Sequence, residues 1–304
     1  IRADQVLVAS TGVIGAQIPI NKIRAGIETM QPMLAHTQAA ATLAAEAIMT
    51  TDTHEKEIAV EVMLGGVPVT IGGMCKGSGM IHPNMGTMLS FITTDCAITH
   101  EMLTDALQEN VKKTYNRVTV DGDTSTNDMC IVLANGMAGN TLIEWQDEEY
   151  QAFCKALNEV NTRLARQIAA DGEGATKLVT CTVKNSRSEE AAERLAKAVV
   201  GSNLVKAAMF GADANWGRVL CAMGYSKAPF RPEYVSVAFE SAAGSVAVCD
   251  KGAALDFDEE LAKKVLSESE VTITVDVNEG EDSATAWGCD LTYDYVKING
   301  DYRT

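Results

Sequence analysis

The chain has 304 residues, of which 46% are hydrophobic and 22% are charged, a composition typical of a folded globular protein rather than a disordered one. Its 41 acidic residues against 25 basic ones give a formal net charge of −16, which would repel phosphate backbones and anionic membranes, so neither nucleic acid nor a membrane is expected as a partner. No apolar run approaches the roughly 18–20 residues that a membrane-spanning helix needs.

The first quarter of the chain is predicted to hold a strand, a helix and a hairpin. Val6 to Val8 form a short apolar run, typical of a buried strand, that ends at a Ser-Thr-Gly turn. Residues 37–49 are rich in alanine and indicate a helix. Apolar residues then alternate along 58–62 and again along 67–71, on either side of Gly65-Gly66, which is the pattern of a β-hairpin.

Strands and helices continue to alternate through the middle of the chain. The stretch TMLSFITTD, from Thr87 onward, predicts a strand. The next segment predicts an amphipathic helix, because four apolar residues recur in it at four-residue spacing: Leu103, Leu107, Val111 and Tyr115. Residues 151–168 indicate another helix and 177–183 another strand. Ser186 and Glu189 match a capping box and predict the start of a helix that stops at Gly201.

The last third of the chain is dominated by one-sided strands. Apolar and polar residues alternate along 235–239 and 271–277, which is typical of strands with one buried face. A regular terminal strand is expected at 290–299. The mixture predicts an α/β protein of the α+β type, in which mixed sheets and helices pack in layers. No linker-like stretch marks a domain boundary.

The cysteines and histidines give no sign of a disulfide framework or a metal site. No two cysteines form a CxxC pair, and most lie in apolar runs, so we expect free thiols in a reducing compartment. The four histidines lie far apart without the spacing of metal ligands. The eight cysteines are Cys75, Cys96, Cys130, Cys154, Cys181, Cys221, Cys249 and Cys289.

The strand at Thr87 follows a glycine-rich loop, KGSGMIHPNMG, that begins at Lys76. A threonine hydroxyl is a weak nucleophile until a base takes its proton, and the α-amino group of an N-terminal threonine can be that base. An internal threonine gains such an amine only if the preceding peptide bond is cut, and a strained loop against a rigid strand favours attack on that bond. Composition alone also allows an ordinary strand-opening threonine after a turn.

The loop resembles the cleavage segment of the ornithine acetyltransferase family, the bifunctional glutamate N-acetyltransferases and amino-acid acetyltransferases of arginine biosynthesis. That family cleaves itself before the threonine of this motif. Six further segments resemble the family in the same order along the chain, so the likeness covers essentially all of it. They are ASTGVIG from Ala9, IMTTDTHEK from Ile48, VDGDTSTND from Val120, GEGATK from Gly172, GADANWGRV from Gly211 and AWGCDLTYDYVKINGDYRT from Ala286.

The resemblance implies a set of catalytic and binding residues. Thr87 would be the nucleophile that carries the acetyl group, released by cleavage between Gly86 and Thr87. Thr11 and Gly12 would form an oxyanion hole, although in isolation their turn is commonplace. Lys76 would pair with a substrate carboxylate. The expected substrate contacts are Thr50, Lys76, Thr87, Glu173, Asn299 and Thr304, with Glu173 assigned to an ornithine ammonium.

The resemblance also implies the reaction and the assembly. Acetyl would pass from N-acetylornithine to glutamate by a ping-pong mechanism, with acetyl-CoA as a possible further donor and no metal or other cofactor. Segments 1–86 and 87–304 would stay associated, two copies of each, in the cytoplasm, in an N-terminal-nucleophile-like fold. The first segment is expected to be incomplete at its start relative to the family. Two alternatives are a hydrolase of the same nucleophile class, such as an aminopeptidase or amidase, and a binding protein without turnover.

The acidic segment VDGDTSTND superficially suggests a calcium loop. Asp121, Asp123 and Asp128 lack the D-x-D-x-[DN]-G spacing and the closing glutamate of such a loop. We interpret the segment as a strand-connecting turn and a candidate border of the site, without a catalytic role. Gly72-Gly73 before Lys76 is interpreted as a place of close backbone packing.

Gly86 stands where the family usually has alanine, and Gly300 likewise. Glycine loses more conformational entropy when it is held in the reactive geometry, by about 0.5–1 kcal/mol. Gly86→Ala should therefore cleave roughly twofold to fivefold faster than the natural sequence. Intact mass of freshly prepared and aged protein measures both rates, and equal rates would contradict the prediction.

Overall fold

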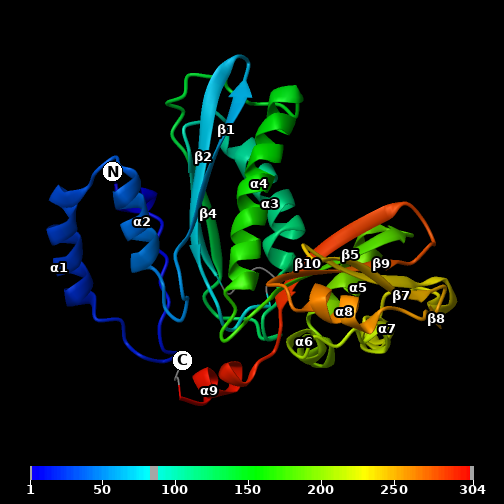
Figure 1. The fold of residues 1–304 in the computed structure, drawn as a ribbon. Helices are drawn as coiled ribbons and strands as arrows, with labels where there is room; N and C mark the ends of the chain where they lie inside the picture. Colours follow the sequence, from blue (N-terminus) through cyan, green and yellow to red (C-terminus); the bar gives the residue numbers. More distant parts are fainter. Residues whose placement is uncertain (1, 83–87, 302–304) are drawn as a thin grey trace.

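The structure is a computed structural model that describes residues 2–82 and 88–301. Two sheets form its framework, one of four strands in the order β1-β2-β3-β4 and one of six in the order β10-β5-β9-β6-β7-β8. Figure 1 shows the smaller sheet standing upright at the centre and the larger one beside it, each with helices packed on it. The layered α/β class predicted from the sequence is confirmed.

The four-stranded sheet begins with the predicted hairpin. Gly65 and Gly66 both have positive φ, 56° and 83°, which is the backbone conformation that a tight two-residue turn requires. The first two strand pairs are antiparallel, and β3 and β4 are parallel. The strands are β1 (Lys56–Leu64), β2 (Val67–Lys76), β3 (Leu89–Thr94) and β4 (Met129–Ala134).

Helices lie on both sides of this sheet. The long helix α4 (Glu148–Ala170) crosses β1 and β2 and buries Phe153, Leu157 and Leu164, with α3 (His100–Lys113) packed beside it. On the other side, α2 (Gln38–Ala47) contacts β1 and β2, and α1 (Ile20–Met30) lies farther out (Figure 1). The helices predicted at 37–49, 103–115 and 151–168 are therefore confirmed, with Tyr115 in a following 3₁₀ turn.

The six-stranded sheet alternates buried and accessible residues as predicted. In β9, Val271, Ile273 and Val275 are buried against helices, whereas the residues between them are only partly covered. The strands are β5 (Leu178–Ser186), β6 (Ser236–Ser241), β7 (Gly244–Asp250), β8 (Ala253–Ala254), β9 (Glu270–Asp276) and β10 (Asp282–Cys289). The helices are α5 (Glu189–Val200), α6 (Asn203–Phe210), α7 (Trp216–Tyr225) and α8 (Glu259–Leu266).

Short 3₁₀ turns and one terminal helix complete the chain. The terminal helix, α9 (Tyr293–Asp301), follows β10. The 3₁₀ turns are Ala3–Gln5, Gln31–Met33, Tyr115–Arg117 and Pro232–Tyr234. In the described residues, every helix is too short or too polar to cross a bilayer.

Three sequence predictions about these elements are wrong. Residues 290–299 are mostly helix α9 rather than a strand, because the Thr292 hydroxyl accepts a hydrogen bond from the Tyr295 N–H and so caps a helical turn. Ser186 ends β5, and the cap of α5 is Ser188, whose hydroxyl accepts from the Ala191 N–H. The predicted stop at Gly201 is confirmed.

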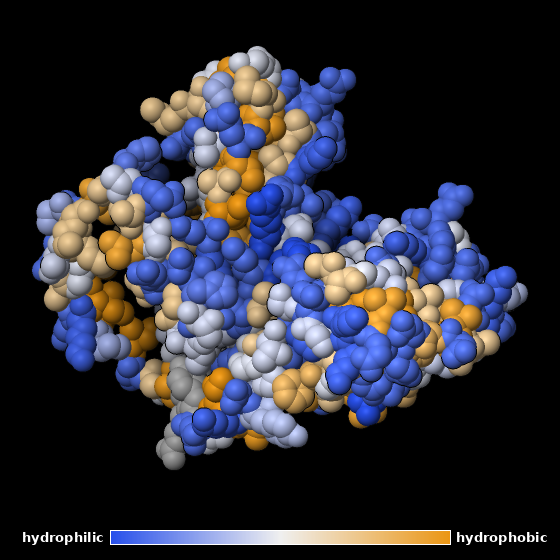
Figure 2. All heavy atoms as spheres, in the orientation of Figure 1, coloured by the Kyte–Doolittle hydropathy of each residue, from blue (hydrophilic) through white to orange (hydrophobic). Residues whose placement is uncertain are grey.

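The third error is the buried strand at Val6 to Val8. These side chains are exposed, with Val8 at 76%, and the segment pairs with no strand in the described chain. A strand gains its stability from pairing and from burying a face, and this run does neither. Figure 2 shows apolar side chains at the surface over the region of α1 and α2, to which this segment belongs.

Gly73 lies where α4 crosses β2, so its lack of a side chain is structural. A Cβ there would lie 3.0 Å from Leu164 Cδ1 and 3.1 Å from Val160 Cγ1, and both neighbours are fully buried and have little room to move. At Gly72, on the opposite face, a Cβ would meet its nearest atom, Ile58 O, at an ordinary 3.9 Å. The close packing predicted for this pair thus applies to Gly73.

Gly73→Ala should therefore lower the free energy of unfolding by about 1–2 kcal/mol, because it overpacks the α4–β2 contact. The matched variant Gly72→Ala should be neutral or slightly stabilising, since it adds a side chain without a clash. Urea unfolding of both variants measures the difference. Equal effects at the two positions would contradict this account.

Candidate active site

A cavity of about 510 Å³ gathers six of the residues predicted to act in catalysis or binding. They come from five separate stretches of chain, and long-range folding alone brings them together. They are Thr11, Gly12, Thr50, Lys76, Glu173 and Asn299. Gly86, Thr87 and Thr304 lie outside the described residues.

The N-terminal segment supplies one wall of this cavity. Thr11 and Gly12 line it together with Val13 and Ile14, and all four are exposed. A Cβ at Gly12 would meet no atom within 4 Å, so the backbone there is open to a ligand. The assignment of Thr11 and Gly12 to an oxyanion hole stays a prediction.

Lys76 is the last residue of β2 and presents a positive charge to the cavity. Its side chain is nearly buried, at 8% exposure, yet within the described chain its ammonium makes no hydrogen bond or ion pair. Burial lowers the pKa of Lys76, and the carboxylates of Asp52 and Asp128 oppose that effect. A nearly buried ammonium without a direct partner is suited to bind an anionic group.

Glu173 supplies a carboxylate to the same cavity. It is 7% exposed, and its Oε2 accepts a hydrogen bond of 2.7 Å from Asn299 Nδ2. The carboxylate lies against Gly79, where a Cβ would clash with the Glu173 carboxyl group and displace it. Because 290–299 is mostly helix, Tyr295 lies one turn before Asn299 and also lines the cavity. Burial raises the pKa of Tyr295, and nearby Asp121 and Glu173 add to that effect.

The loop at 120–128 borders the cavity, as the turn interpretation predicted. Asp121 accepts hydrogen bonds from the backbone N–H groups of Met80 (2.6 Å) and Ile81 (3.0 Å) and so anchors the glycine-rich loop. Six residues of the loop line the cavity, Asp121 and residues 123–127. In the part of the chain that is described, no group of histidine, cysteine and acidic side chains has the geometry to hold a metal ion.

Beneath the cavity lies a buried charge network that the sequence analysis did not identify. The ammonium of Lys56, which is fully buried, lies 2.6 Å from Asp52 Oδ1 and 2.5 Å from Asp171 Oδ2. Burial by itself would raise the pKa of Asp52, but the Lys56 charge and the N–H groups of Gly77 and Thr50 outweigh it, and that pKa is lowered. Asp52 and Lys56 lie in the segment IMTTDTHEK. The acidic residue four positions before the lysine is the sequence feature that could have indicated this ion pair.

Asp128 is a second residue to which the sequence analysis gave no role. Both of its carboxylate oxygens are sealed from solvent, and in the described part of the chain neither has a hydrogen-bond partner of normal geometry. It immediately precedes β4, whose Met129 N–H donates to Met88 O at the start of β3. Burial raises the pKa of Asp128 to about 6, against the opposing effects of the Met88 N–H and the Lys76 ammonium.

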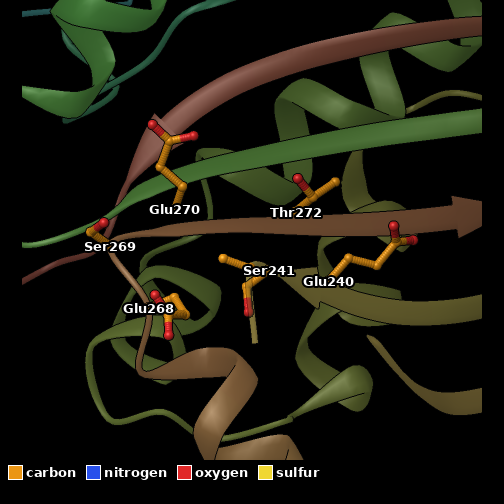
Figure 3. Close-up of a pocket in the computed structure, with 7 residues that line it drawn as sticks. Glu240, Ser241, Glu268, Ser269, Glu270 and Thr272 are labelled. Atoms are coloured by element: carbon orange, nitrogen blue, oxygen red, sulfur yellow. The ribbon is translucent and has the colours of Figure 1, made fainter. Parts of the chain in front are cut away.

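A second cavity, of about 480 Å³, lies on the six-stranded sheet and contains none of the predicted site residues. Figure 3 shows its acidic lining, with Glu240 from β6 and Glu270 from β9. Its described lining combines three carboxylates and three hydroxyls but no positively charged side chain, so it offers no group to bind the carboxylate of an amino-acid substrate. The candidate active site is therefore the cavity with Lys76 and Glu173.

The raised pKa of Asp128 predicts a pH-dependent cost in stability. The folded chain holds the Asp128 proton more tightly than the unfolded chain, whose pKa is near 3.8, so stability should fall as pH rises from about 4 to about 6. Asp128→Asn should remove this loss. Its free energy of unfolding should exceed that of the wild type by about 1–2 kcal/mol at pH 8 and differ little from it near pH 4. Urea unfolding across this range measures it. A variant less stable at pH 8 would contradict the prediction.

Comparison with known proteins agrees with the motifs. The sequence model of the ArgJ family matches residues 1–304. The arginine biosynthesis bifunctional protein ArgJ 1 of Clostridium acetobutylicum is 55% identical over all of this chain and 74% of its own, and the ArgJ protein of Thermotoga neapolitana is 50% identical over all of this chain and 76% of its own. The crystal structure of ArgJ from Bacillus halodurans matches with a TM-score of 0.67 and 44% identity, over 71% of this chain and 100% of that one. The chain therefore belongs to the ArgJ family, the arginine-biosynthesis family that its motifs predicted.

Proposed function

We propose that this protein is an acetyltransferase of arginine biosynthesis that moves acetyl from N-acetylornithine to glutamate through an acetyl-threonine at Thr87. The observation that carries the proposal is the presence of opposite charges in one cavity, lined both by the ammonium of Lys76, which has no direct partner among the described residues, and by the carboxylate of Glu173. Both substrates are amino acids with an α-carboxylate. The curated relatives are named bifunctional proteins of arginine biosynthesis, which agrees with this chemistry.

The charges suggest how each substrate is held. Lys76 would bind the α-carboxylate by a charge-assisted hydrogen bond. Glu173, oriented by Asn299, would receive the side-chain ammonium of ornithine. Thr50 completes the same wall as Lys76. A ligand with a carboxylate and an ammonium would pair with both Lys76 and Glu173, whereas an uncharged amide would pair with neither.

Thr87 would act only after self-cleavage between Gly86 and Thr87. The solved ArgJ chain of Bacillus halodurans matches over its whole length, and the match takes up 71% of this chain. Residues 87–304 make up a similar fraction of this chain, which supports a separate segment with those bounds. Thr87 directly precedes Met88, whose carbonyl pairs with Met129, so a rigid strand begins immediately after the proposed nucleophile. Two copies each of segments 1–86 and 87–304 would form the cytoplasmic enzyme, as the family resemblance implies.

The proposed reaction has two half-reactions. The neutral Thr87 amine takes the proton of its own hydroxyl, which attacks the acetyl carbonyl of N-acetylornithine. Thr11 and Gly12 stabilise the resulting oxyanion, and loss of one such donor typically costs about 3–4 kcal/mol of barrier. When the intermediate collapses, its C–N bond breaks, and the Thr87 ammonium returns the proton to the leaving nitrogen, which releases ornithine. The neutral amine of glutamate then attacks the acetyl ester, its C–O bond to Thr87 breaks, and the proton of the attacking amine returns to the Thr87 hydroxyl. Acetyl-CoA would load the same threonine in a bifunctional member.

Intact mass spectrometry with and without N-acetylornithine tests the proposal. The protein should run as two segments, and the one that begins at Thr87 should gain a single acetyl group, which glutamate then removes as N-acetylglutamate. Thr87→Ala should remain one chain without acetylation, because it lacks the hydroxyl that both steps need.

Each alternative gives a different result. Acetyl release without glutamate would show a hydrolase instead. One uncut, unacetylated chain from the natural sequence would overturn the proposal and favour a binding protein.

A further inference from the structure

We propose that Lys56 is a positioning residue for this reaction: its buried ammonium joins the three loops that carry Thr50, Lys76 and Glu173, and so fixes the spacing between the carboxylate-binding and ammonium-binding walls. The inference rests on the proposed function and goes beyond it, because Lys56 is not among the described residues that line the cavity and is not one of the predicted substrate contacts.

The first arm of the network runs through Asp52 to the Lys76 wall. Asp52 Oδ1 binds Lys56 Nζ at 2.6 Å and also accepts from the Gly77 N–H at 2.7 Å, directly after Lys76. Its other oxygen accepts from the Thr50 N–H at 3.1 Å. One carboxylate therefore sets the backbone beside two of the predicted substrate contacts.

The second arm runs through Asp171 to the Glu173 wall. Asp171 ends α4 and lies two residues before Glu173, and its Oδ2 lies 2.5 Å from Lys56 Nζ. The same carboxylate accepts from the N–H of Thr53 at 3.0 Å and from the Thr53 hydroxyl. His54 Nδ1 lies 3.4 Å from its Oδ1, on the half-exposed side.

Two further hydrogen bonds join the same three loops directly to one another. The Glu173 N–H donates to Ser78 O at 2.9 Å, and the hydroxyls of Thr51 and Ser78 lie 2.6 Å apart. The loops at 50–53, 77–79 and 171–173 are thus held to one another and to a single cation. A change at that cation is transmitted to both walls, although it lies outside the cavity.

The network also explains why Lys76 has no direct partner within residues 2–82 and 88–301. Asp52 and Asp171 both bond to Lys56, so neither forms an ion pair with Lys76, whose ammonium faces the cavity. Buried ion pairs are often replaceable by apolar groups without loss of stability, so a cluster of this kind is poorly explained by stability alone. Control of geometry is the better account of it.

Removing only Lys56 would leave two buried carboxylates facing each other and would destabilise the fold. The test variant is therefore Lys56→Met with Asp52→Asn and Asp171→Asn, which removes all three charges and keeps the side chains similar in size. Asp171→Asn alone is a milder second variant. Lys112→Met, at the exposed Lys112–Glu109 pair of α3, is the matched control for loss of a lysine beside an acid.

Two acyl donors separate positioning from folding. N-acetylornithine carries both the carboxylate that Lys76 would bind and the ammonium that Glu173 would bind. The rate at which it acetylates Thr87 should fall about 100-fold in the triple variant and at least 10-fold in Asp171→Asn. Acetylation by p-nitrophenyl acetate, a small neutral ester, should change less than threefold in both variants. Lys112→Met should match the wild type with both donors.

The other outcomes are decisive as well. Unchanged N-acetylornithine rates in a folded triple variant, or an equal loss with both donors, would overturn the positioning role. If the triple variant does not fold, Asp171→Asn decides by the same comparison. A wild type acylated by the ester but not by N-acetylornithine would overturn the proposed function instead, and amide exchange at Gly77 and Thr53 would then show whether Lys56 still holds the loops.

Discussion

The buried ammonium of Lys56 is the interaction on which the candidate site depends. It lies at the first residue of β1 and contacts a carboxylate in the loop before that strand and another at the C-terminus of α4. The C-terminal end of a helix carries partial negative charge, so the position after α4 already favours a cation. Sheet, helix and loop are joined at one charge, and the glycine-rich loop after β2 is bonded to the same network through Gly77.

Strand register places the rest of the site at the same end of the small sheet. Lys76 at the end of β2 pairs with Leu89 at the start of β3, which in turn pairs with Met129 at the start of β4. The residues around the start of β3 therefore lie between Lys76 on one side and Asp128 on the other. This edge holds an ammonium and a sealed carboxylic acid next to the strand that follows Thr87, an arrangement in which burial shifts both pKa values toward the neutral forms.

Local patterns predicted the elements whose stability is local. The Gly65-Gly66 hairpin, the alternation in β9 and the spacing of apolar residues in α3 and α4 are visible in short windows, and the structure confirms them. The errors occur where a pattern fits two structures. Tyr293 and Tyr295 alternate like a strand, yet Thr292, directly before Tyr293, caps a helix. Val6 to Val8 have strand composition but no partner strand among the described residues.

The candidate site was predictable to a different degree. Its residue types came from resemblance to a family, because nothing in the spacing of Lys76, Glu173 and Asn299 requires them to meet. The network below them could not be predicted from local sequence, since Lys56 and Asp171 lie 115 residues apart.

The two lysines show why that network matters for chemistry. Lys56 pairs with Cys75, the residue before Lys76, in the β1–β2 ladder. Both lysines are nearly or fully excluded from solvent, and both lie in the field of Asp52. Two carboxylates bind the Lys56 ammonium, whereas the Lys76 ammonium has no direct partner in the part of the chain that is described. A buried unpaired ammonium costs free energy in the empty site, and a bound carboxylate recovers it. The Lys76 ammonium, which has no direct partner among the described residues, is thus the charge that a substrate carboxylate can neutralise.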